Sequence, residues 1–159
     1  MKVKNIRKYL TEEQITERVK AMGEQISRDY GGETVYLICI LKGSIFFTCE
    51  LAKRIASPVE IDFMSVSSYG DDTKSSGVVK IVKDLDIELE GYDIVIVEDI
   101  LDSGKTLSYL LDILQSRGPR SIRICTLFDK PERREVDVQA TYTGAEIPDA
   151  FIVGYGLDS

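Results

Sequence analysis

Three long, mostly apolar runs limit the folds open to this chain more than any other feature. They are VYLICIL (35–41), YDIVIVEDI (92–100) and IRICTLF (122–128), and all three are rich in β-branched residues. A run of this kind is typical of a strand that is covered on both faces, as in a parallel sheet. Such strands need helices on each side, so the runs predict an α/β domain.

Helical patterns alternate with these runs. Thr11 and Gln14 match a capping box, apolar residues then recur every three or four positions up to Tyr30, and Gly31-Gly32 is expected to end this helix. A second helix is expected over 44–55, with Ser44 as its cap, and a third over 107–118. The alternation indicates a mostly parallel central sheet flanked by helices.

Shorter patterns fill the remaining chain. VEIDFMSVSSY (59–69) alternates apolar and polar residues as a half-covered strand does, and VVKIVKDL (78–85) is expected to return as its neighbour. The polar segment GDDTKSSG (70–77) between them is predicted to be a mobile loop. Near the end, TGAEIPDA (143–150) is predicted to be a turn and FIVGYG (151–156) a final strand.

Composition narrows the classes of function. The 159 residues suit one domain, 1–159, and 20 basic against 27 acidic side chains give a net charge of -7, which disfavours nucleic-acid binding. The chain shows neither a membrane-spanning run nor a secretory signal, so a cytoplasmic protein is expected. Cys39, Cys49 and Cys125 form no zinc motif and are predicted to be core thiols. Because there is no histidine, acid-base chemistry falls to carboxylates, lysines, backbone amides or a metal.

The segment VIVEDILDSGKTL (95–107) carries the strongest functional signal. In open parallel sheets, ligands bind beyond the carboxyl ends of the strands. Residues 102–106 can present backbone N–H groups and hydroxyls at a helix start, which suits a phosphate. Glu98 and Asp99 would repel phosphate oxygens and instead suit sugar hydroxyls or Mg²⁺. The order of these groups therefore matches a sugar phosphate.

Two alternative interpretations compete with this one. Gly104-Lys105-Thr106 looks like the end of a P-loop, but that motif requires glycine at the position of Asp99. The P-loop interpretation fails on that residue. The other alternative is that the acids only cap a helix and face solvent.

These residues, together with motifs elsewhere in the chain, resemble those of a known family. The 95–107 segment is similar to the phosphoribosyl-pyrophosphate (PRPP) signature of type I phosphoribosyltransferases, and the whole chain resembles their hypoxanthine-guanine branch. The resemblance implies a type I phosphoribosyltransferase fold with a small hood formed by the terminal segments. Five motifs occur in the family's order: LKGS (41–44), SSYG (67–70), the signature, LFDKP (127–131) and EIPDAFIVGYGLD (146–158).

The resemblance implies a role for each residue of the signature. Glu98 and Asp99 would hold the ribose hydroxyls directly or through Mg²⁺. Asp102 would lie near N7 of the purine as general base. The 5′-phosphate would be bound by the backbone of Asp102 and by Ser103, Gly104, Lys105 and Thr106. The family usually has threonine at the position of Ser103, and little effect is expected.

The resemblance also implies a pyrophosphate site and a lid. Lys42 and Gly43 would form a non-proline cis or switching peptide whose amides meet pyrophosphate, whereas local sequence alone favours an ordinary turn with a solvated lysine. Residues 68–77 would form a flexible lid that excludes water, with Ser68 and Tyr69 near its hinge.

Further residues are implied at the purine and at the metal. Lys130 would donate to O6 of a 6-oxopurine, although local sequence alone favours a surface lysine. Phe151 would stack on the base and the Ile152 backbone would read its edge, although a core strand explains them equally well. Asp158 matches the position of the family's second Mg²⁺ ligand, although a terminal acid without a role in binding is the alternative. Family members usually continue past this point with an arginine-bearing stretch, whereas this chain ends at Ser159.

The leading hypothesis is therefore an enzyme that joins hypoxanthine or guanine to PRPP and releases IMP or GMP with pyrophosphate. A regulatory protein of the same fold that senses RNA or nucleotide is the alternative, and the acidic charge counts against it. The family resemblance further suggests Mg²⁺ as cofactor and a homodimer or homotetramer.

Overall fold

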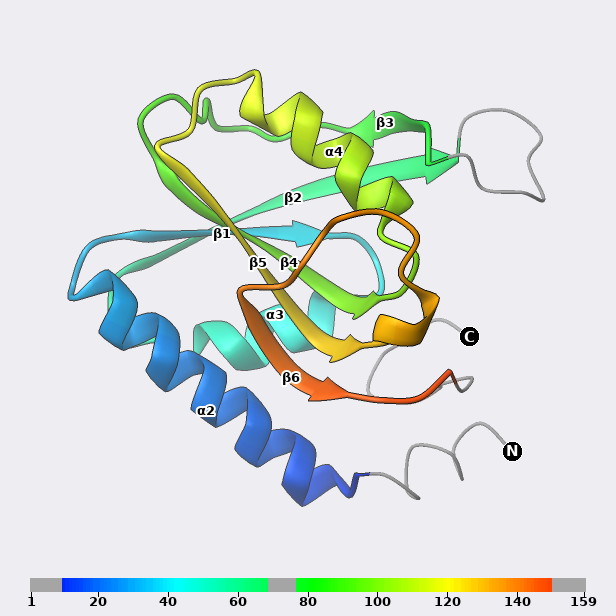
Figure 1. Cartoon of the computed structure of the whole chain (residues 1–159). Helices are drawn as coiled ribbons and strands as arrows, with labels where there is room; N and C mark the ends of the chain where they lie inside the picture. Colours follow the sequence, from blue (N-terminus) through cyan, green and yellow to red (C-terminus); the bar gives the residue numbers. More distant parts are fainter. Residues whose placement is uncertain (1–9, 69–76, 150–159) are drawn as a thin grey trace.

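The computed structural model describes residues 10–68 and 77–149. Its strands form one six-stranded sheet in the order β3-β2-β1-β4-β5-β6 (Figure 1), in which β3 is antiparallel to β2 and all other neighbours are parallel. The strands are β1 (Val35–Ile40), β2 (Val59–Ser68), β3 (Val79–Lys83), β4 (Asp93–Leu101), β5 (Ser121–Asp129) and β6 (Tyr142–Glu146). The predicted α/β fold with a mostly parallel sheet is confirmed.

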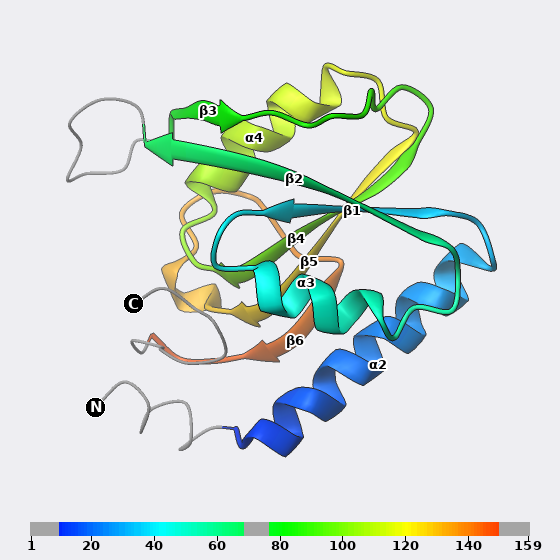
Figure 2. The same cartoon turned by 180° about the vertical axis from the view of Figure 1, so that it is seen from behind.

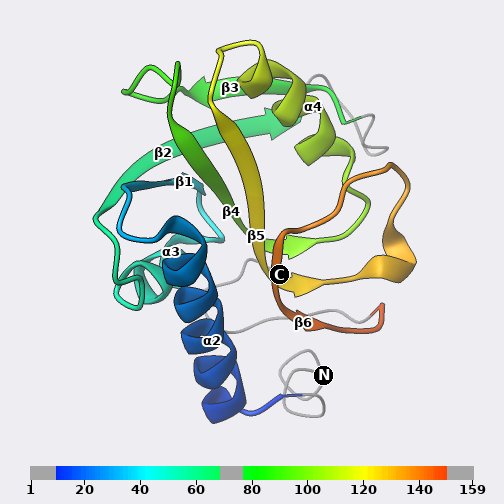
Figure 3. The ribbon, with the colours of Figure 1, turned by 60° about the vertical axis from the view of Figure 1, so that its left-hand side comes forward.

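Helices cover the two faces of this sheet. Helices α2 (Glu12–Tyr30) and α3 (Ile45–Ala52) lie on one face and α4 (Lys105–Gln115) on the other, as Figures 1 and 2 show from opposite sides and Figure 3 from an oblique angle. Alternate residues of β4 serve the two faces: Val95 and Val97 pack with α2 and α3, and Ile94 and Ile96 pack with α4. No helix in the described ranges is long and apolar enough to cross a membrane.

Local sequence accounts for both ends of α2. The Thr11 side chain accepts from the Gln14 backbone N–H at 3.1 Å, and the Gln14 side chain accepts from the Thr11 N–H at 2.8 Å. This reciprocal pair is the predicted capping box. The helix ends at Gly31, whose φ of 54° lies in the left-handed region that glycine tolerates.

Helix α3 differs from the prediction in three details. It ends at Ala52 instead of residue 55. The hydroxyl of Ser44 donates to the Ile40 carbonyl at 2.5 Å and does not cap the helix, because Ser44 is buried with a ψ of 6°. Cys49 is exposed, so it is not a core thiol, whereas Cys39 and Cys125 are buried as predicted. Phe46, on the outward face of this short helix, is 60% exposed to solvent.

Strand β6 corrects the predicted turn at 143–150. Residues Tyr142–Glu146 pair in parallel with β5, so Gly144 lies within a strand and not in a turn. A Cβ on Gly144 would lie 2.4 Å from the Leu127 carbonyl oxygen, so close approach of two backbones requires glycine there. The expected strand at 151–156 and the terminal hood lie outside the described residues.

Candidate active site

The carboxyl ends of β1 and β4 and the start of α4 enclose a cavity of about 240 Å³. Glu98 and Asp102 contribute carboxylates to it, and the loop that follows them contributes polar groups. The residues that line it are Ile40, Glu98, Ile100, Leu101, Asp102, Ser103, Gly104, Thr106 and Leu107. The structure therefore brings together five of the residues that the sequence singles out, at the expected edge of the sheet.

The loop before α4 and the first turn of this helix form one wall of the cavity. Gly104 is the N-cap with a φ of 81°, a left-handed conformation that glycine favours. Ser103 Oγ accepts from the Lys105 N–H at 3.3 Å, and Asp102 Oδ1 accepts from the Ser103 N–H at 2.8 Å. Lys105 does not line the cavity, since its ammonium pairs with Glu135 at 3.1 Å. The helix dipole and first-turn N–H groups favour an anion at this position.

The two adjacent acids of β4 lie on opposite sides of the sheet. Glu98 has the parity of Ile96 and points into the cavity, and Asp99 has the parity of Val97 and lies against Gly43. Burial, followed by the neighbouring carboxylates of Asp99 and Asp102, raises the pKa of Glu98 well above its usual range. This edge of the sheet thus gathers negative charge, which a cation would relieve.

The turn after β1 approaches Asp99 closely. An ideal Cβ on Gly43 would lie 2.2 Å from Asp99 Oδ2, so a larger residue there would require the Asp99 carboxylate to shift. Asp99 Oδ1 accepts from the Ile100 N–H at 2.7 Å. The cis peptide bond is found between Leu41 and Lys42, one bond before the Lys42-Gly43 peptide. Lys42 itself is exposed.

The donor set at this edge fits Mg²⁺ that is held jointly by protein and substrate. Within the described ranges, no group of three Asp, Glu, Cys or His side chains converges on one point. Mg²⁺ commonly takes only one or two carboxylates from the protein and the rest of its oxygens from water and substrate phosphates. Glu98 and Asp99, which lie on the two sides of the sheet at this edge, can each supply one such carboxylate.

Lys130 is 8% exposed, which contradicts the surface lysine that local sequence favours. It follows β5, and its backbone N–H donates to the Leu101 carbonyl at 2.8 Å. Its ammonium lies 3.9 Å from Asp149 Oδ1, at the limit of an ion pair. A lysine buried to this degree at a ligand-binding edge favours a role in recognition.

Several predicted residues lie outside the described residues: Tyr69, Phe151, Ile152 and Asp158, together with positions 70–76 of the predicted lid. The described flanks of that lid are informative. Ser68 ends β2 and pairs with Val79 of β3. A Cβ on Gly77 would lie 2.9 Å from the Lys105 backbone oxygen, so the lid segment returns beside the start of α4.

Sequence reasoning missed two residues that contact the loop. Arg134 Nε donates to the Asp102 carbonyl at 3.0 Å, and the Glu135 N–H donates to the Ser103 carbonyl at 2.9 Å. Both belong to the charged, turn-like stretch DKPERREVD (129–137). The only hint in the sequence was the position of Arg134 four residues after Lys130.

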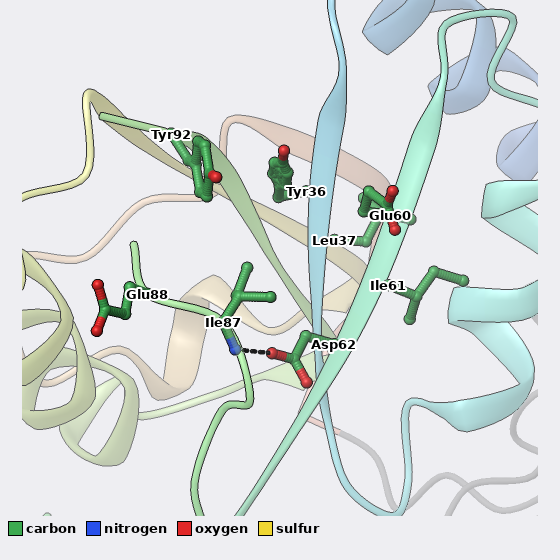
Figure 4. A pocket seen from close by; sticks show the side chains of 8 residues that line it. All are labelled: Tyr36, Leu37, Glu60, Ile61, Asp62, Ile87, Glu88 and Tyr92. Carbon is green, nitrogen blue, oxygen red and sulfur yellow. Dashed lines mark hydrogen bonds between the residues drawn. The ribbon is translucent and has the colours of Figure 1, made fainter. Parts of the chain in front are cut away.

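A second cavity of about 360 Å³ lies at the opposite end of the sheet, near the starts of β1 and β2 (Figure 4). Its wall includes the ring pair of Tyr36 and Tyr92, whose centroids are 4.3 Å apart. The buried carboxylate there, Asp62, already accepts from the backbone N–H groups of Phe63, Asp86 and Ile87. This satisfied acid anchors a loop, so the smaller cavity is the better candidate for chemistry.

Comparisons with known proteins identify the family of this chain. A family model described as a phosphoribosyl transferase domain matches residues 6–159. The chain is 49% identical over 156 residues to a hypoxanthine-guanine phosphoribosyltransferase of Streptococcus thermophilus, covering 98% of this chain and 87% of that protein. It is 50% identical over 149 residues to the Bacillus subtilis enzyme of the same name, covering 94% and 83%.

Solved structures give the same result. A crystal structure of a hypoxanthine-guanine phosphoribosyltransferase from Bacillus anthracis, with a HEPES molecule in its active site, superposes with a TM-score of 0.90 at 49% identity. The match covers 94% of this chain and 88% of that chain.

Proposed function

This chain belongs to the phosphoribosyl transferase family, and from that membership we propose how its residues carry out the reaction. The reaction moves the 5-phosphoribosyl group of PRPP to hypoxanthine or guanine, gives IMP or GMP with pyrophosphate, and thereby salvages purines. The regulatory alternative is not favoured, because the relatives with about half of their residues identical are enzymes.

One observation supports the assignment of residues best: Glu98, Asp102 and the loop of Ser103, Gly104 and Thr106 share a single cavity at the strand ends. Its first-turn N–H groups suit the 5′-phosphate, with the hydroxyls of Ser103 and Thr106 as further donors. With the phosphate there, the ribose would extend toward Glu98. This order is the one that the sequence predicts.

Asp102 is the proposed general base. Its carboxylate is exposed to the cavity and would accept the N7 proton of the purine while N9 attacks C1′ of the ribose. The N9–C1′ bond forms as the bond between C1′ and the pyrophosphate oxygen breaks. The loss of this proton keeps the purine neutral. Because N9 displaces pyrophosphate directly, no covalent enzyme intermediate is required.

Glu98 and Asp99 are proposed to stabilise the positive charge that develops at the ribose. That charge is greatest in the transition state, so a nearby carboxylate favours the transition state over the ground state. The two acids would also hold Mg²⁺ together with the substrate oxygens. When bound there, the metal would neutralise charge on the departing pyrophosphate.

The base and the leaving group are assigned to neighbouring loops. Lys130 would donate to O6, which favours 6-oxopurines because an exocyclic amine cannot accept that bond. Lys42 and Gly43 would hold pyrophosphate beside Asp99. The roles predicted for Phe151, Ile152, Asp158, Ser68 and Tyr69 stay predictions.

We also propose that the chain forms a homodimer or homotetramer in the cytoplasm. The apolar side chains Ile45 and Phe46 of α3 are exposed, as are Ile61 and Phe63 on the same face of β2, and a second copy could cover them. Light scattering of wild-type protein and Phe46→Asp tests this. A monomeric wild type would contradict it.

The activity itself is tested by spectrophotometry. Purified protein with PRPP and Mg²⁺ should convert hypoxanthine and guanine, but not adenine, into nucleotides. Turnover that does not depend on PRPP would contradict the proposal.

A further inference from the structure

Three successive carbonyls of the loop after β4 are held by one short segment of the chain. The Leu101 oxygen accepts from the Lys130 N–H at 2.8 Å, and the Ser103 oxygen accepts from the Glu135 N–H at 2.9 Å. Between them, the Asp102 oxygen accepts from Arg134 Nε at 3.0 Å. Arg134 is thus the side-chain donor in a set whose other two donors are backbone groups.

The direction of these carbonyls determines the direction of the loop amides. In a planar trans peptide, the C=O of one residue and the N–H of the next point to opposite sides. Holding the Asp102 oxygen toward Arg134 therefore turns the Ser103 N–H away from Arg134, toward the cavity. The Ser103 N–H in fact donates to the carboxylate of Asp102, which lines the cavity.

Arg134 is itself held by several partners. Its guanidinium forms an ion pair with Asp129 at the end of β5, and Nη1 donates to the Val138 carbonyl at 2.7 Å. Its side chain is only 16% exposed, and Cδ would lie 3.1 Å from a Cβ placed on Gly104. The planar fork of an arginine can serve three partners in fixed directions, which a lysine cannot do.

From these contacts we infer that Arg134 is a positioning residue: it fixes the Asp102–Ser103 peptide. It thereby holds the Ser103 N–H, and the Asp102 carboxylate that accepts from it, on the cavity side of the loop that is proposed to bind the 5′-phosphate. It touches neither the substrate nor the reacting atoms. The inference rests on the proposed phosphate site at residues 102–106.

The test measures what the phosphate adds to binding. The ratio of the inosine Kd to the inosine 5′-monophosphate Kd isolates that contribution, because the two ligands differ only in the phosphate. It is measured by calorimetry on the full chain for wild type, Arg134→Gln and Arg134→Lys. Arg133→Gln is the matched control, since Arg133 is the adjacent arginine, is 51% exposed and pairs with Asp149 instead of the loop.

Arg134→Gln should lower the ratio at least tenfold and raise the KM for PRPP, while Arg133→Gln should change the ratio less than twofold. Arg134→Lys keeps the charge beside Asp129 and should fall between them, and it carries the test if the glutamine variant does not fold. A ratio that is unchanged in the folded Arg134 variants, or lowered equally by Arg133→Gln, overturns the inference. A wild type that does not distinguish the two ligands would instead refute the phosphate site, and with it the proposed function.

Discussion

The two ends of strand β4 treat their acidic residues in opposite ways. At the start, Asp93 accepts from Arg120 Nε at 3.1 Å and from the Ser121 hydroxyl at 2.6 Å, and the bond to Arg120 lowers the pKa of Asp93. At the end, Glu98 is next to further carboxylates and has a raised pKa. Asp93, which supports the fold, is paired with arginine, whereas burial and then the carboxylates of Asp99 and Asp102 disfavour the charged form of Glu98 at the ligand-binding edge, a cost that a bound cation can relieve.

The largest difference between the two ends of β4 is expected from Asp102→Asn. Loss of a general base should lower kcat about 10²- to 10⁴-fold, with the melting temperature within a few degrees of wild type. The same substitution at the other end, Asp93→Asn, should leave kcat unchanged. Steady-state kinetics and thermal melting of both variants check this, and an Asp102→Asn enzyme with wild-type turnover would remove Asp102 from the mechanism.

Gly43→Ala should test the acidic end of β4 by displacing the Asp99 carboxylate without removing it. The new methyl group would lie 2.2 Å from Asp99 Oδ2, so the carboxylate must shift, and the KM for PRPP should rise roughly tenfold or more. Adding Asp99→Ala makes room for the methyl group, so the two effects should be strongly non-additive in a double-mutant cycle. Simple additivity would show that the contact does not matter.

Glu98→Gln should separate binding from stability. Removing a partly buried carboxylate that lies beside like charges should raise the melting temperature of the ligand-free protein by roughly 2–5 °C. The same change should weaken Mg²⁺-dependent binding of PRPP, because one proposed ligand is lost. Calorimetry at several Mg²⁺ concentrations tests the second part, and a melting temperature that falls would contradict the first.

The smallest effect is expected from Asp93→Asn on stability. The free energy of unfolding should fall by about 1 kcal/mol, as for a partly screened ion pair with an added hydrogen bond. Because the folded pKa of Asp93 is lowered, its contribution is present above the unfolded pKa near ~4 and is lost as the pH falls through the folded pKa. Urea unfolding at pH 7 and at several pH values below ~4 should therefore show a difference that shrinks as the pH falls.

The sequence predicted the sheet and the site edge because both depend on local patterns. The runs at 35–41 and 92–100 are apolar on both faces, and Thr11 and Gln14 form a capping box that needs no distant partner. Strand β6 was missed because Gly144 is required by the backbone of Leu127, which lies in another strand. Arg134 was missed for the same reason: its value depends on Asp102, 32 residues away in the chain.

The central position of β4 in the sheet should determine the temperature at which activity is lost. β4 is hydrogen-bonded along both edges, to β1 and to β5, so its amides should be among the last to exchange with deuterium. The acids at its end therefore stand on a strand that opens only when the whole domain opens. Thermal inactivation should accordingly follow global melting, with little activity lost at lower temperatures.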